Sequence, residues 1–201
     1  MKKLNLPKLR ISLPFTLLIA TLYALDFGKV FAPTFAAVII HELSHIIATR
    51  ACGGSISSVD VRIFGIRVDV PELKLMSYKR EIIIAAAGPL AGILTAGIAA
   101  VTARYYDIPN IDYFIGINIV ISAINLIPVY PLDGGRIVLS LALSLFSLNF
   151  ASALCKCITF IAIFGLLLLC TVFALSGILN PSLVIFSLYI AMCGIRFRAP
   201  F

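Results

Sequence analysis

Charged residues are scarce in this chain of 201 residues. Asp, Glu, Lys and Arg make up 12% of the sequence, against about a quarter of an ordinary soluble domain, while 61% of the residues are hydrophobic. This imbalance excludes a disordered chain, a nucleic-acid-binding module and an ordinary soluble enzyme. It predicts an integral membrane protein. Because each span takes about 20 apolar residues, the chain has room for at most about six to eight spans and for no large soluble domain.

Cysteine and histidine are scarce as well. The five cysteines form no C-x-x-C pair, and four of them lie in apolar stretches. We therefore expect small apolar side chains there, and neither a disulfide framework nor a cysteine-based zinc site. Histidine occurs only twice, as His41 and His45, with Glu42 between them.

Six apolar segments predict transmembrane helices. They cover about residues 11–25, 30–51, 81–103, 113–127, 158–175 and 183–195. A further apolar stretch, 132–148, either continues the fourth span beyond a break at two prolines or dips partly into the membrane. The basic N-terminus is followed by an apolar run but by no small-residue cleavage site, so we expect a retained first span. The predicted fold is an all-α polytopic membrane protein with a single domain over residues 1–201.

Residues 55–70 follow a different pattern from the rest of the chain. Apolar and charged side chains alternate there from Val59 to Ile63 and again from Ile66 to Val70, with a turn candidate at Phe64-Gly65. Alternation with a period of two is typical of strands. We predict a short β-hairpin beside the membrane, after the second helix.

The basic residues indicate an orientation. With the N-terminus in the cytoplasm and six spans, all 16 Lys and Arg residues except Lys29 and Arg104 fall on the cytoplasmic side, as membrane proteins prefer. Both termini are then cytoplasmic. Since topology explains the net charge of +7, no nucleic-acid partner is expected.

The two histidines belong to an H-E-x-x-H sequence inside the second predicted span. Side chains four residues apart share one face of a helix, so His41 and His45 could bind one Zn²⁺ while Glu42 serves as general base toward a water molecule. Ionisable residues inside a span are costly and usually functional. A polar contact between helices without a metal is the alternative.

Asp133 is the candidate for a third ligand. Zinc hydrolases typically use three protein ligands, and no further histidine exists. Asp133 lies in the segment NLIPVYPLDGGR, residues 125–136, where two prolines break the helix and two glycines permit close backbone approach. An isolated Asp-Gly-Gly would be a turn, but broken backbone at membrane depth is tolerated where it lines a cavity. Both motifs fall toward the cytoplasmic ends of their spans, so we predict that they share a metal.

These two motifs, within about residues 35–136, resemble those of the site-2 protease family of intramembrane zinc metalloproteases. That family pairs an H-E-x-x-H helix with an N-x-x-P-x-x-P-L-D-G segment. The resemblance implies a catalytic core at about residues 30–148 and one Zn²⁺ per chain. It implies the following site: His41, His45 and Asp133 as zinc ligands, Glu42 as catalytic base and Asn125 as a substrate or transition-state contact.

Within that family, the six-span layout and the sequence PLDGGR most resemble the stage IV sporulation protein FB branch. The resemblance implies hydrolysis of a membrane-embedded or membrane-associated protein, such as the pro-sequence of a sporulation sigma factor. The expected location is the cell membrane or the membrane around the forespore of a spore-forming bacterium, with lipid, the substrate and regulatory membrane proteins as partners. We expect no C-terminal CBS module in this chain. Gly92 stands where family members often carry asparagine, and its spacing from Gly88 predicts close helix packing.

Two other function classes remain open from the sequence. A membrane metal transporter would need polar residues along a path through the bilayer, whereas the acidic residues here cluster at segment ends. A non-catalytic membrane scaffold would have no need of Glu42 between the histidines.

Overall fold

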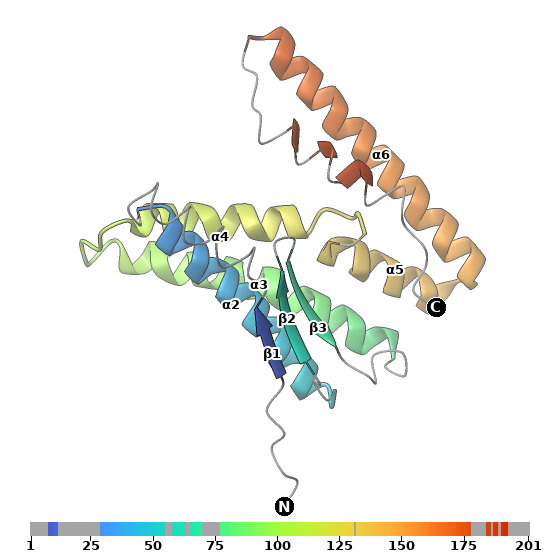
Figure 1. The fold of residues 1–201 in the computed structure, drawn as a ribbon, viewed down its shortest axis with the longest axis horizontal. Coiled ribbons are helices and arrows are strands. Elements are labelled where there is room, and N and C mark those ends of the chain that lie inside the picture. Colours follow the sequence, from blue (N-terminus) through green and yellow to red (C-terminus); the bar gives the residue numbers. More distant parts are fainter. Residues whose placement is uncertain are drawn as a thin grey trace, which may run out of the picture. The chain divides into compact units, whose positions relative to one another are not determined.

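In the part of the chain that it describes, the computed structural model shows helices and one small sheet (Figure 1). The residues that it describes are 8–11, 29–54, 58–62, 65–69, 77–130 and 132–177, with 184–185, 187–188 and 190–192. The chain forms two compact units, Met1–Ala123 and Ile124–Phe201. Each unit is described by itself.

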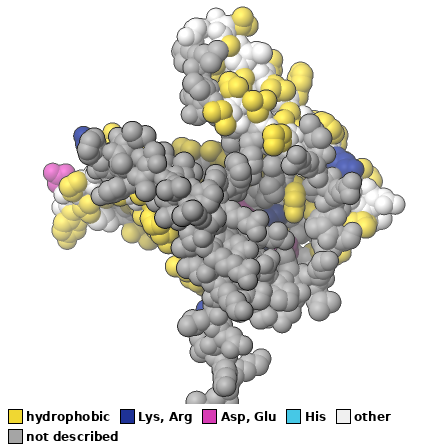
Figure 2. All heavy atoms as spheres, viewed as in Figure 1, with side chains coloured by type: hydrophobic (Ala, Val, Ile, Leu, Met, Phe, Trp, Pro, Cys, Tyr) yellow, Lys and Arg dark blue, Asp and Glu magenta, His cyan; other side chains and the backbone are white. Residues whose placement is uncertain are grey.

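Within the described ranges, three helices are long and apolar enough to cross a membrane: α2 (Phe31–Ala51), α3 (Tyr78–Thr102) and α6 (Leu148–Leu175). At 1.5 Å per residue, the 21 residues of α2 extend about 32 Å, which matches a hydrocarbon core of about 30 Å. The shorter helix α4 (Ile111–Asn125) is also apolar. The side chains exposed along α6 are mostly apolar, as expected of a surface that meets lipid. Hydrophobic side chains are yellow in Figure 2.

The second and third predicted spans coincide with helices α2 and α3, and the fourth coincides with α4. The fifth was predicted to begin at Ile158, but α6 begins ten residues earlier, at Leu148. The stretch after the prolines is a separate helix, α5 (Asp133–Leu145), and not an extension of α4. Of the first predicted span, residues 12–25 lie outside the described residues, as do six of the 13 residues of the sixth.

The sheet contains three strands in the order β1-β2-β3. Strand β2 (Ser58–Arg62) pairs antiparallel with β3 (Gly65–Asp69), so two strands lie where the alternating sequence predicts them. Gly65 was predicted as part of the turn, but it pairs with Arg62 inside the ladder. Strand β1 (Lys8–Ile11) pairs parallel with β2. The prediction that Ile11 begins a span was wrong, because Ile11 lies opposite Val61 in this ladder.

Within the first unit, α2 and α3 pack through faces repeated every four residues. The buried residues of α2 are Ala37, His41, His45 and Thr49. Those of α3 are Ile84, Ala85, Gly88, Pro89, Gly92, Ala96 and Ala99. Small residues on a helix face let two backbones approach closely. This packing brings the α3 backbone against the histidines.

The second unit is built around α5 and α6. Its core contains five buried residues, Leu139, Ala142, Leu143, Ala151 and Cys155, with Tyr130 packed against them. The first turn of α5 lies tightly against the preceding segment, since a Cβ on Gly134 would meet the carbonyl of Leu126. The start of α5, where Asp133 lies, is thereby fixed to the chain before it.

Candidate metal centre

Helix α2 presents both histidines on its buried face. His41 is 5% exposed and His45 is 9% exposed, one helical turn apart. Because α2 is an uninterrupted helix, residues four apart lie on the same face, and His41 and His45 are neighbours in space. The prediction that the two rings share a face is confirmed.

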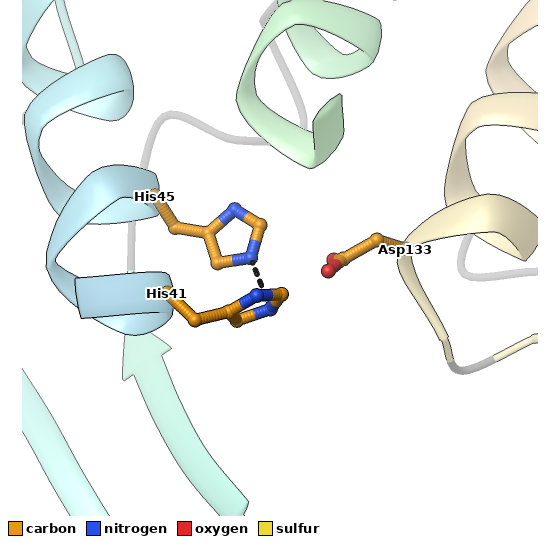
Figure 3. A group of neighbouring side chains, drawn as sticks. All are labelled: His41, His45 and Asp133. Carbon is orange, nitrogen blue, oxygen red and sulfur yellow. Dashed lines mark hydrogen bonds between the residues drawn. The ribbon is translucent and has the colours of Figure 1, made fainter. Parts of the chain in front are cut away.

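The two imidazole rings converge on each other. The Nε2 atoms lie 3.2 Å apart, and the ring planes are inclined at 81° (Figure 3). Two nitrogens, each about 2.0–2.1 Å from a tetrahedral zinc ion, would be about 3.3 Å apart. The Nε2 atoms therefore already have the separation that a shared zinc ion requires, and this pair of residues fits the metal.

A backbone carbonyl of α3 orients the His45 ring. The Nδ1 atom lies 2.7 Å from the carbonyl oxygen of Ile84, and a carbonyl can only accept, so Nδ1–H donates. The proton on Nδ1 leaves Nε2 of a neutral imidazole with its lone pair free to bind a metal. Such a hydrogen bond on the far nitrogen is the usual way in which proteins fix a ligating histidine.

Gly88 allows α3 to cover the two rings. A Cβ at this position would lie 2.8 Å from Cε1 of His41 and 2.7 Å from Cε1 of His45, closer than carbon atoms pack. The predicted close packing at Gly88 and Gly92 is therefore confirmed. The sequence did not identify what each glycine packs against, which at Gly88 is the candidate metal-binding pair.

Glu42 and Asn125 are half-buried residues of described helices. Glu42 follows His41 in α2, about 100° further round the helix, and Asn125 is the last residue of α4. The roles predicted for them as base and substrate contact stay predictions.

Asp133 is the first residue of α5 and belongs to the second unit. Its side chain is nearly buried, at 6% exposed, and Arg136 Nη1 lies 3.3 Å from its Oδ1 atom. A carboxylate in the first turn of a helix faces free backbone N–H groups and the positive end of the helix dipole. Figure 3 includes Asp133 as the third side chain of the candidate ligand set.

Helix α4 contains two buried polar residues that the sequence analysis missed. Asn118 and Ser122 are each 1% exposed. The available signal was their spacing of four residues within an otherwise apolar helix, which places them on one face.

Comparisons with known proteins point to one family. Over 108 residues the chain is 28% identical to a zinc metalloprotease of Methanocaldococcus jannaschii, covering 51% of this chain and 31% of that protein. Over 133 residues it is 32% identical to stage IV sporulation protein FB of Bacillus subtilis, covering 60% of this chain and 45% of that protein. The matches thus span less than half the length of these relatives. No protein-family model matches the chain.

The fold has a close counterpart among solved structures. The site-2 protease of Methanocaldococcus jannaschii matches with a TM-score of 0.69 at 20% sequence identity, covering 98% of this chain and 97% of that one. At this identity the likeness establishes the fold. The sequence relatives, which are 28% and 32% identical over 51% and 60% of this chain, support its assignment to the site-2 protease family.

Proposed function

We propose that this chain is a zinc-dependent endopeptidase that hydrolyses peptide bonds of membrane proteins within the bilayer. The observation that carries the proposal is the histidine pair of α2, with Nε2 atoms 3.2 Å apart on a buried helix face. A separation of 3.2 Å also suits a hydrogen bond between the rings, so the support for a metal comes from two further features: the Ile84 carbonyl that orients His45 and the Gly88 backbone that covers both rings.

The proposed zinc ligands are His41, His45 and Asp133, holding one ion per chain. Each offers one ligand atom, an imidazole nitrogen or a carboxylate oxygen. Three protein ligands leave one position of a tetrahedron open, as catalytic zinc sites require. Asp133 comes from the second unit, so its ligation calls for a test of its own.

The chemistry assigns separate roles to the metal and to Glu42. When bound, zinc supplies Lewis-acid activation of a water molecule and of the scissile carbonyl. The Glu42 carboxylate takes the proton that the water gives up and can return it to the leaving amine. Its place in the turn that carries both histidines supports this role. Asn125, at the end of α4, is proposed to contact the substrate.

The proposed substrate is an extended segment of a membrane-embedded or membrane-associated protein. A helical peptide bond is shielded by its own hydrogen bonds, so the substrate must unwind before cleavage. Among the described strands, β3 is paired on one side only, by β2. An extended substrate could add to its other edge through main-chain hydrogen bonds.

The topology and the biological setting are narrower parts of the proposal. We propose a multi-pass protein with about six spans and both termini in the cytoplasm, supported by the distribution of Lys and Arg. The match to stage IV sporulation protein FB supports a role in sporulation. The motif resemblance described above is the basis for proposing a sigma-factor pro-sequence as substrate.

The experiment compares two variants of the purified full chain in lipid vesicles. Glu42→Gln should keep zinc and lose cleavage of a membrane-protein substrate, because the amide cannot take a proton. His41→Ala should lose both. Cleavage that persists in Glu42→Gln would contradict the proposal. Zinc retention with metal flux into the vesicles and no cleavage would favour a transporter instead.

A further inference from the structure

Helix α4 buries two polar side chains next to the face of α3 that packs on the histidines. Asn118 and Ser122 are each 1% exposed, and their spacing of four residues places them on one side of α4. Polar groups inside an apolar environment reduce stability unless they are hydrogen-bonded. Their presence in the middle of a mostly apolar helix therefore calls for an explanation.

Both side chains face Gly92 of α3. A Cβ on Gly92 would collide with Ser122 Oγ and would lie 3.7 Å from Asn118 Oδ1. Gly92 is one turn along α3 from Gly88, which lies against the histidine rings. One turn of a helix rises about 5.4 Å, so the polar pair lies about that far along α3 from the proposed zinc ligands.

The hydrogen bonds of this pair are incomplete. Asn118 Nδ2 donates to the carbonyl of Phe114, 2.8 Å away, which leaves its amide oxygen on the side toward Gly92. Ser122 Oγ is buried and has no hydrogen-bond partner among the residues that the structure describes. Elsewhere in the helices, Ser44, Thr49 and Thr95 donate their hydroxyl protons to the carbonyl four residues earlier. Ser122 does not, so its donor remains available.

We propose that Ser122 and Asn118 bind the backbone of the substrate beside the scissile peptide bond. Ser122 donates its O–H to a substrate carbonyl, and Asn118 Oδ1 accepts a substrate N–H. In an extended peptide, groups that point to the same side recur about every 6.8 Å, close to the rise of one helical turn. A substrate whose scissile carbonyl lies at the histidines therefore brings its next peptide group on that side to Ser122. This inference rests on the proposed zinc peptidase function.

The test separates backbone binding from metal binding by using two zinc-binding probes. Acetohydroxamate offers only the metal-binding group, whereas a hydroxamate carrying an Ile-Leu dipeptide amide also offers peptide N–H and C=O groups. Affinities for both are measured on the zinc-loaded full chain by calorimetry. Ser122→Ala should bind acetohydroxamate like the wild type and the dipeptide hydroxamate about 3- to 10-fold more weakly, as the loss of one hydrogen bond predicts. Asn118→Leu, which keeps the branching of the side chain but removes both polar atoms, should show the same selective loss.

The control variant is Thr102→Ala, which removes an exposed hydroxyl at the far end of α3 and should change neither affinity. Equal affinity of the wild type and Ser122→Ala for the dipeptide hydroxamate would overturn the inference. So would a parallel loss of zinc or of acetohydroxamate binding in Ser122→Ala, since that indicates a structural role. A wild type that binds neither probe would instead refute the proposed zinc site, and this inference with it.

Discussion

Gly88→Ala provides the sharpest test of how the fold forms the proposed zinc site. The added methyl carbon would lie 2.8 Å from Cε1 of His41 and 2.7 Å from Cε1 of His45. Non-bonded carbons pack at about 3.5–4.0 Å, so both rings or the α3 backbone must move by about 0.7 Å or more. Zinc–ligand distances tolerate only about 0.2 Å. The convergence of the two Nε2 atoms, now 3.2 Å apart, should be lost or strained.

We expect the zinc dissociation constant of Gly88→Ala to rise at least about 10-fold, the effect typical of disturbing the groups that orient metal ligands. The measurement is zinc content by mass spectrometry, after equilibration of the purified full chain with chelators of graded affinity. Gly97→Ala is the matched control, because it lies in the same helix and a Cβ there would meet nothing within 4 Å.

Helix propensity does not confound this comparison. Alanine is favoured over glycine in a helix interior by up to about 1 kcal/mol, and both variants gain that term. Any difference in zinc affinity between them therefore reports the contact of position 88 with the rings. Equal zinc affinities for Gly88→Ala and Gly97→Ala would refute the reasoning that the close approach of α3 holds the rings in place.

Two further predictions concern the second unit. Asp133→Ala should weaken zinc binding by more than about 100-fold, a larger loss than is typical when a residue that only orients a ligand is replaced. The control Asp112→Ala removes an exposed carboxylate and should leave zinc binding unchanged. Unchanged zinc content in Asp133→Ala would show that Asp133 is not a ligand. Gly134→Ala should lower the unfolding midpoint in SDS titrations by an amount equivalent to about 1–3 kcal/mol, because its Cβ would collide with the backbone carbonyl of Leu126. Gly165→Ala in α6, where a Cβ meets nothing within 4 Å, should leave the midpoint unchanged or raise it, and equal midpoints for the two glycine variants would contradict the packing argument.

The sequence predicted the parts of the site that depend on local periodicity. A spacing of four residues in a helix places His41 and His45 together whatever surrounds them, and long apolar runs mark α2, α3 and α6. The start of α6 was missed because its first ten residues contain Asn149, Ser152 and Lys156, which lower the apolar signal while leaving the helix intact.

Contacts between distant segments were not predictable in the same way. Strand β1 is only four residues long. Lys8, Leu9 and Arg10 were assigned to a basic flank and Ile11 to the first span, because the partner strand β2 lies about fifty residues further along the chain. Glycine spacing in α3 predicted close packing, but no local rule says which residue faces which glycine. The spacing of Asn118 and Ser122 places them on one face of α4, but no local rule predicts that this face lies against Gly92.

On the face of α3 that packs against the site, the backbone and the lack of side chains at two glycines determine the contacts. Ile84 contributes its backbone carbonyl to His45, Gly88 leaves room for the two imidazole rings, and Gly92 leaves room for the polar side chains of α4. These three positions are spaced by four residues, so one helix face aligns the candidate metal ligands with the proposed backbone-binding pair. On the buried face of α3, Gly88 and Gly92 are the positions where replacement by alanine adds an atom. The positions with the smallest side chains are therefore the ones that set the distances within the site, since only their backbone can approach the rings and hydroxyl closely enough.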